Sequence, residues 1–187
     1  MEYNPKSGFS LMEAVMVMAI VAILSVPGAY LMSYLVQNSV FIPNQLNMDM
    51  LASDALDIMI EGDSQAKGLR FSKSITNVQD YQVTFNNQDG QSIRYRLETS
   101  VDPSQLYRSI KGGPEELIPY YVTSGVSITG KNNRLFTFYD AAEGVTNNPS
   151  NVRRIEMTLI VKTGTGNYSD WEGQSEQASS IAVKKFQ

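Results

Sequence analysis

The sequence contains neither cysteine nor histidine. Without cysteine the chain can form no disulfide, no thiol nucleophile and no thiolate metal site. Without histidine it lacks the commonest general base and the commonest zinc ligand. These absences argue against an enzyme, and we expect no catalytic residue, no metal site and no cofactor.

Charge is also scarce over the first quarter of the chain. The 187 residues include 15 basic and 19 acidic residues, for a net charge of −4. This balance gives no overall electrostatic reason to bind nucleic acid, so no nucleic-acid partner is predicted. Between Phe9 and Met48 the only side chain charged at neutral pH is that of Glu13. The uneven charge predicts an apolar N-terminal segment followed by one ordinary domain.

Residues 9–35 form an almost uninterrupted apolar run. As a helix the run would be about 40 Å long, and the hydrocarbon core of a bilayer is roughly 30 Å thick. Lys6 precedes the run, and the acidic residues that follow it begin at Asp49. The positive-inside rule then predicts one pass through the inner (cytoplasmic) membrane, with the N-terminus in the cytoplasm and the C-terminal domain in the periplasm or outside the cell.

Three simple interpretations of this run compete. A secretory signal peptide could end at Pro27-Gly28-Ala29, although proline fits the small-residue cleavage rule poorly. A plain signal anchor could tether a periplasmic domain. A buried core helix would be shorter and less apolar.

Glu13 decides among these interpretations. A charge inside the membrane costs at least about 2.5–3.5 kcal/mol, so it normally has a partner and a purpose. No lysine or arginine of the apolar run can pair with it. The partner is therefore expected on another chain or at a newly made amine.

The string Lys6-Ser7-Gly8-Phe9-Ser10-Leu11-Met12-Glu13 resembles the processing site of type IV prepilins and type II secretion pseudopilins. The resemblance implies that the prepilin peptidase cuts between Gly8 and Phe9, and that Phe9 is then N-methylated. It also implies that Glu13 pairs with the new amine of Phe9 on a neighbouring subunit. Such a pair would fix the axial register of the subunits, as a buried polar residue does in a coiled coil.

Pro27 and Gly28 interrupt the apolar run. Proline removes a helical hydrogen bond, so the two residues predict a kink, which membrane helices tolerate. The family resemblance offers a second interpretation, in which the helix bends or melts here during assembly.

Beyond the apolar run, the helical pattern is expected to continue through Pro43 to about Glu61, with Gly62 near its C-cap. The predicted buried stripe holds Leu46, Met50, Leu51, Ala55, Leu56 and Met59, and the predicted exposed side holds Asn47, Asp49, Ser53, Asp54 and Asp57. The expected divisions of the chain are a cleaved leader (1–8), a transmembrane helix (9–35), its amphipathic continuation (36–62) and an exported β-rich head domain (63–187).

From Leu69 onward the pattern alternates with period two. Tyr81–Phe85 and Ile93–Leu97, joined by a polar turn, predict a β-hairpin. One long helix followed by strands predicts an α+β fold in which a long N-terminal helix packs on a mainly antiparallel sheet. Further strands are expected at Gln105–Ile110, Tyr120–Thr129, Leu135–Tyr139, Val152–Lys162 and Ala178–Phe186, with a polar loop over Gly164–Gln177.

The order of short motifs along the whole chain is similar to that of J-type minor pseudopilins and W-type minor pilins. These include Ile93–Leu97, Leu106-Tyr107-Arg108 and Phe136–Asp140. The resemblance implies a structural subunit that primes or caps a type II secretion pseudopilus or a type IV pilus. Its partners would be other pilin or pseudopilin subunits and the prepilin peptidase. One alternative is a filament-tip binding module for adhesion, DNA uptake or secreted-substrate recognition, and another is a signal-anchored enzyme.

The head offers few candidates for chemistry. Glu115-Glu116 is expected in a solvated helix start or loop. Asp140–Gly144 could supply oxygen ligands to calcium, but a polar loop is favoured because the spacing is not that of an EF-hand. Arg94 and Arg96 should share a strand face opposite to Tyr95, so charge and stacking are not combined for single-stranded nucleic acid. Gly164-Thr165-Gly166 lacks the context of a phosphate loop, and Trp171 is expected to fold back onto the core.

Overall fold

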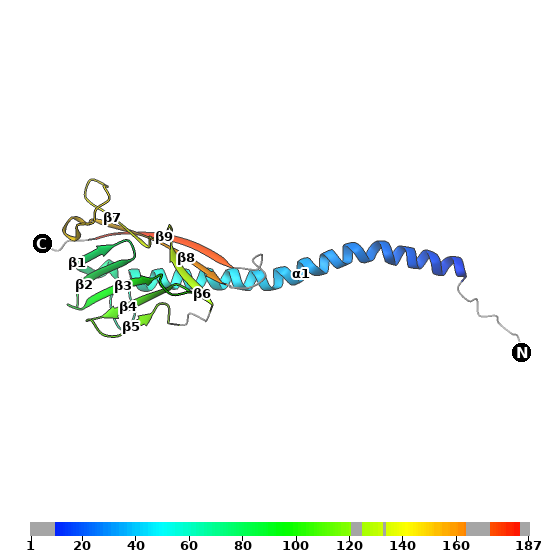
Figure 1. The fold of residues 1–187 in the computed structure, drawn as a ribbon, viewed down its shortest axis with the longest axis horizontal. Helices are drawn as coiled ribbons and strands as arrows, with labels where there is room; N and C mark the ends of the chain where they lie inside the picture. Colours follow the sequence, from blue (N-terminus) through cyan, green and yellow to red (C-terminus); the bar gives the residue numbers. More distant parts are fainter. Residues whose placement is uncertain (1–9, 121–124, 133, 164–172, 184–187) are drawn as a thin grey trace, which may run out of the picture. The chain divides into compact units, whose positions relative to one another are not determined.

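The computed structural model describes residues 10–120, 125–132, 134–163 and 173–183. The chain forms two compact units, Met1–Val40 and Phe41–Gln187. Helix α1 (Leu11–Ile60) contributes its first residues to one unit and its last residues to the other (Figure 1).

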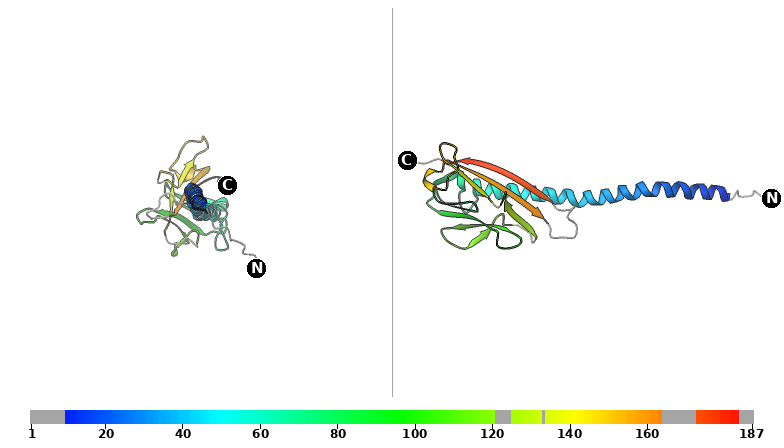
Figure 2. Two further views of the ribbon diagram at one scale, coloured as in Figure 1. Left: turned by 90° about the vertical axis from the view of Figure 1, so that its right-hand side faces the viewer. Right: turned by 45° about the horizontal axis from the view of Figure 1, so that its top comes forward.

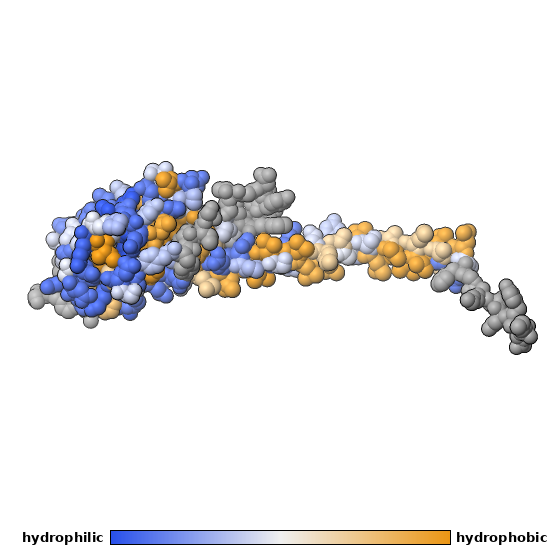
Figure 3. Space-filling model, turned by 90° about the horizontal axis from the view of Figure 1, so that it is seen from below, coloured by the Kyte–Doolittle hydropathy of each residue, from blue (hydrophilic) through white to orange (hydrophobic). Residues whose placement is uncertain are grey.

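The described part of the first unit is an apolar helix, residues 11–40. The side chains from Leu11 to Leu35 are exposed in the isolated chain, and apolar residues gather along this segment (Figure 3). Helical structure continues through Pro27, Gly28 and Pro43. Uninterrupted exposure of large apolar side chains is unusual in water and marks a surface that lipid or other protein must cover.

The second unit begins with the amphipathic part of α1. Its buried side chains recur at spacings of three and four, at Met48, Leu51, Ala52, Ala55, Leu56, Met59 and Ile60. The predicted positions of Leu46 and Met50 on the buried stripe were wrong, since they are 59% and 55% exposed. Neither residue is three or four positions away from a buried residue of α1. The helical repeat of 3.6 residues therefore turns both side chains away from the sheets.

Helix α1 ends where the sequence indicated. Gly62 has a φ of +91°, and its N–H donates to the Ile58 carbonyl at 3.0 Å. A Cβ at Gly62 would lie 2.1 Å from the Ala66 carbonyl oxygen. Only glycine fits this close approach of two backbone segments, so the C-cap is fixed by sterics as well as by φ.

The first sheet has five antiparallel strands in the order β1-β2-β3-β4-β5. The predicted hairpin is confirmed as β2 and β3, with Thr84 opposite Arg94, and the predicted strand Gln105–Ile110 is confirmed as β4. Side chains of the hairpin alternate between a buried face, which includes Phe85 and Tyr95, and a more polar outer face. The strands are β1 (Ser72–Gln79), β2 (Gln82–Asn87), β3 (Ser92–Glu98), β4 (Gln105–Ile110) and β5 (Glu115–Leu117), and a 3-10 helix, η1 (Leu69–Phe71), precedes them.

The second sheet is built around its longest strand, β8. One edge of β8 pairs with β6 and β7, and the other pairs along its length with β9. The strands are β6 (Val126–Gly130), β7 (Phe136–Tyr139), β8 (Arg154–Thr163) and β9 (Gln174–Ala182), and η2 (Pro149–Asn151) precedes β8. Strand β9 begins before the predicted Ala178, so the predicted loop was wrong for residues 174–177.

Both sheets lie against the C-terminal part of α1 (Figure 2). Buried apolar side chains of this helix segment, the first sheet and the second sheet form one continuous core. The α+β prediction, with a long N-terminal helix packed on antiparallel sheets, is confirmed.

Candidate functional site

The N-terminal candidate site centres on Glu13, in the first turn of α1. The Ser10 N–H donates to Glu13 Oε2 at 2.8 Å, and the Glu13 N–H donates to Ser10 Oγ at 3.2 Å. This reciprocal pair is a capping box, which satisfies two N–H groups that a helix start otherwise leaves unpaired. Ser10 was missed as a functional residue, although Ser-x-x-Glu before an apolar run is the recognised signature of such a cap.

The capping box gives Glu13 a hydrogen-bond partner within its own chain, which the sequence alone did not predict. The helix N-terminus also favours a nearby carboxylate. Within residues 10–183 as the structure describes them, no cation contacts Glu13. Gly8 and Phe9 lie outside the described residues, so cleavage, methylation and the pairing of Glu13 with Phe9 stay predictions.

Helix α1 also meets the length and composition of a membrane span. Among the described residues it is the one helix long and apolar enough to cross a bilayer, and none of its most apolar window is buried within the protein. The site therefore combines a capped helix start, one carboxylate and an apolar surface that is exposed among the described residues.

The head contains a buried arginine, Arg108, whose burial cannot be seen from the sequence alone. Arg108, on β4, has a side chain with no exposed surface, and its Nη1 lies 2.9 Å from Asp63 Oδ2. Its Nη2 donates to Gln65 Oε1 at 3.2 Å and to the Tyr120 hydroxyl, and lies 3.5 Å from Glu116 Oε2. These contacts tie the loop after α1 to β4, β5 and Tyr120.

The pKa values of this cluster follow from burial opposed by hydrogen bonding. Burial alone would raise the pKa of Asp63, but hydrogen bonds from Arg108, Tyr120 and two backbone N–H groups outweigh it and lower this pKa to about 2. Burial and the hydrogen bond that Tyr120 donates to Asp63 at 2.5 Å raise the pKa of Tyr120 to about 12. The ionised carboxylate and the neutral phenol are thus both stabilised, as expected of a structural ion pair.

The expectation that Glu115-Glu116 lies in a solvated helix start or loop was wrong. Both residues lie on β5. Glu115 Oε1 accepts from Arg94 Nη2 at 2.8 Å, and its Oε2 accepts from Arg96 Nη2 at 2.6 Å. Arg94 and Arg96 of β3 hold Glu115 by ion pairs on the outer face of the sheet, which stabilises this acidic segment as a strand. Because the arginines are about 20 residues away in sequence, the local pattern could not show this.

Arg94 and Arg96 lie on the face opposite to Tyr95, as predicted. The Tyr95 hydroxyl points into the core and donates to the Ile58 carbonyl at 3.1 Å. Arg96 lies instead over the Tyr107 ring of the next strand, 5.7 Å from its centroid. Since both guanidinium groups are held by Glu115, the outer face is a zwitterionic cluster and not a basic patch.

The Asp140–Gly144 segment uses its carboxylate to close a turn. Asp140 Oδ1 accepts from the Ala142 N–H at 2.8 Å and from the Gly144 N–H at 3.0 Å. In the described part of the chain no three His, Cys, Asp or Glu side chains lie together as metal ligands would. The polar-loop interpretation fits these contacts, whereas Trp171 and Gly164-Thr165-Gly166 lie outside the described residues.

Comparison with known proteins bears on the N-terminal site alone. Residues 3–29 match the family model of the prokaryotic N-terminal methylation motif. No curated protein and no solved structure matches the chain. The matched segment contains the predicted cleavage site, the capping box and the first part of the apolar helix. Over this segment the chain is similar to the N-terminal region of pilins and pseudopilins, and α1 is long and apolar enough to anchor it in a membrane.

Proposed function

We propose that the protein is a structural minor subunit that primes or caps a type IV pilus or a type II secretion pseudopilus. The observation that carries the proposal is Glu13, the one charged side chain of the apolar segment, placed in the first turn of α1 within the methylation-motif match. A residue so costly in a membrane needs a function, and assembly supplies one.

The proposed sequence of events starts with the full chain in the inner membrane, N-terminus in the cytoplasm and head outside. The peptidase removes residues 1–8, and the amine of Phe9 is methylated. The transmembrane part (9–35) and its continuation (36–62) then pack against the helices of neighbouring subunits, and the head (63–187) lies on the filament surface. Pro27 and Gly28 provide a place where the helix can bend during this transfer.

Glu13 has two roles in this proposal. In the precursor it caps its own helix through Ser10. After cleavage, its second carboxylate oxygen is available to the methylated amine of a neighbouring subunit. A hydrogen-bonded pair in an apolar helix bundle costs much less than an unpaired carboxylate, so the pair selects one axial register.

Glu13→Ala in the full chain, expressed with its peptidase and partner subunits, tests this mechanism. Membrane insertion should be unimpaired, because the change removes a charge from hydrocarbon, and cleavage after Gly8 should persist. Co-purification of partner subunits from detergent-solubilised membranes should fall at least about fivefold, a loss of roughly 1 kcal/mol.

Ser10→Ala is the matched control. It removes the hydroxyl that caps the helix and leaves both the carboxylate of Glu13 and the backbone N–H of Ser10 in place. Partner recovery should stay near that of the unmodified chain. Undiminished recovery with Glu13→Ala would show that the carboxylate is not an assembly contact.

A filament-tip binding module is the second candidate function. It is favoured by a polar hollow on the outer face of the first sheet, which is lined by residues such as Thr84 and Arg94.

A further inference from the structure

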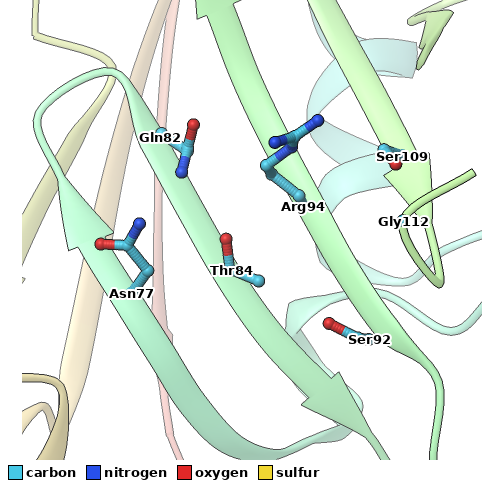
Figure 4. A pocket seen from close by; sticks show the side chains of 7 residues that line it. All are labelled: Asn77, Gln82, Thr84, Ser92, Arg94, Ser109 and Gly112. Atoms are coloured by element: carbon cyan, nitrogen blue, oxygen red, sulfur yellow. The ribbon is translucent and has the colours of Figure 1, made fainter. Parts of the chain in front are cut away.

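The outer face of the first sheet is hollowed where four strands run side by side. A cavity of about 440 Å³ opens on this face. Figure 4 shows the lining side chains standing on one face of β1, β2, β3 and the end of β4. They include Asn77, Gln82, Thr84, Ser92, Arg94 and Ser109. We call this cavity the polar hollow.

Strand register explains why these side chains meet. Asn77 lies opposite Thr84, Thr84 opposite Arg94, and Arg94 opposite Ser109. Successive side chains of a strand alternate between the two faces of the sheet. The intervening side chains, such as Val83 on β2, are buried in the core, so the polar row is fixed on the outer face.

The hydrogen-bonding groups of the polar hollow are largely free. Among the residues that the structure describes, the side chains of Asn77, Gln82, Thr84 and Ser92 donate to and accept from no other protein group. These carboxamides and hydroxyls present donors and acceptors together. Arg94 donates to Glu115 through Nη2, and this carboxylate balances its charge. The remaining N–H groups of Arg94 can donate to a ligand.

The lining chemistry argues against several ligand classes. It contains no aliphatic or aromatic side chain, so an apolar ligand would meet only the methyl and methylene groups of polar side chains. It contains no carboxylate to hold a cation. Its single cation is paired with Glu115, which leaves no net charge for a polyanion such as nucleic acid.

We infer that the polar hollow binds a neutral carbohydrate chain. Every sugar hydroxyl both donates and accepts, as the free carboxamides and hydroxyls of the lining do. A second hollow of about 490 Å³ is lined by Ser74 and Asn86 and also by the cationic Lys73. It adjoins the polar hollow, because Asn86 lies opposite Ser92. Together the two hollows suit an oligosaccharide better than a single sugar.

The affinity of one such site should be weak. No aromatic ring lines the polar hollow. The site therefore offers no ring on which the flat apolar face of a sugar could stack. A Kd on the order of 1 mM is expected for one copy. Repetition of the head in an assembly, or several heads on one surface, would raise the overall affinity through multivalency. The inference holds whether or not the chain assembles as proposed above.

The experiment measures binding of the full chain, held in micelles of a detergent without sugar groups, to a surface that carries oligosaccharides at high density. The probes are immobilised neutral oligosaccharides of hexose and N-acetylhexosamine units, with sulfated and sialylated glycans alongside. Binding to at least one neutral oligosaccharide is expected. The double variant Gln82→Leu with Thr84→Val should weaken that binding at least about tenfold, since it removes hydrogen-bonding groups and keeps side-chain volume.

Thr137→Val is the control, because Thr137 lies on β7 outside the polar hollow. It should bind as the unmodified chain does. If the double variant lacks a cooperative thermal transition, Thr84→Val alone replaces it and should weaken binding about threefold. Binding restricted to sulfated or sialylated glycans, no binding to any neutral oligosaccharide, or equal binding by the hollow variants and the control would each overturn the inference.

Discussion

Asp63→Asn would leave the buried Arg108 guanidinium without its nearest counter-charge. The Asp63 side chain is 20% exposed and that of Arg108 is fully buried. Removing one partner of a buried pair costs about 3–5 kcal/mol. Here Arg108 keeps Gln65, Tyr120 and the more distant Glu116, so we expect a loss near the lower end of that range.

The pKa of Asp63 gives a second route to the magnitude. Its folded value of about 2 lies below the ordinary value of 3.8, and a pKa unit corresponds to about 1.4 kcal/mol. The ionised carboxylate therefore adds roughly 2–3 kcal/mol to the stability of the head. Because the folded pKa is the lower one, this contribution is complete above about pH 5 and is lost as the pH falls from about 4 to 2.

The assay is urea unfolding of the full chain in micelles, followed by the near-ultraviolet circular dichroism of its tyrosines. Asp63→Asn should lower the free energy of unfolding by about 2–3 kcal/mol at pH 7, and the difference should shrink toward zero near pH 2.

Asp80→Asn is the matched control, since Asp80 pairs with Arg134 at 3.1 Å with both side chains about half exposed. It should cost less than about 1 kcal/mol. Equal losses for the two variants, or a loss at Asp63 that does not depend on pH, would refute the reasoning.

Gly62→Ala and Tyr95→Phe test the joint between α1 and the first sheet by the same assay, and Gly90→Ala, in the turn between β2 and β3, is the control for Gly62→Ala. Gly62→Ala places a Cβ 2.1 Å from the Ala66 carbonyl oxygen at a φ of +91°, and should cost at least about 2 kcal/mol. Gly90→Ala, whose Cβ would meet nothing within 4 Å at a φ of +74°, should cost about 1 kcal/mol, and a similar loss at both sites would contradict the steric argument. Tyr95→Phe removes the hydrogen bond to the Ile58 carbonyl and should cost about 1 kcal/mol without moving the unfolding m-value.

Much of the fold could be predicted because several segments carry a local signal. The hairpin of β2 and β3 faces the core on one side and water on the other, so its residues alternate visibly. Strand β1 shows no such alternation, because it lies at the sheet edge and buries few residues, among them Ser72 and Val78. Strand β9 starts in the polar segment 174–177, where pairing with β8 and not its own composition decides the structure.

The candidate sites differ in the same way: one is formed by residues close in sequence, and the others by residues that only the fold brings together. The Ser10–Glu13 box is local, and its spacing is visible in the sequence. The Arg108 cluster joins groups as far apart as Asp63 and Tyr120, so only the folded chain brings them together. The polar hollow likewise depends on strand register, which sets Thr84 opposite Arg94.

The most direct test of the central claim is the intact mass of the mature protein from membranes of a cell that expresses the cognate peptidase. We predict a chain that begins at Phe9 and carries one methyl group on its amine. A mature chain that begins at Tyr30, as after signal-peptide removal, or one that retains Met1, would contradict the claim that this protein is processed as a prepilin.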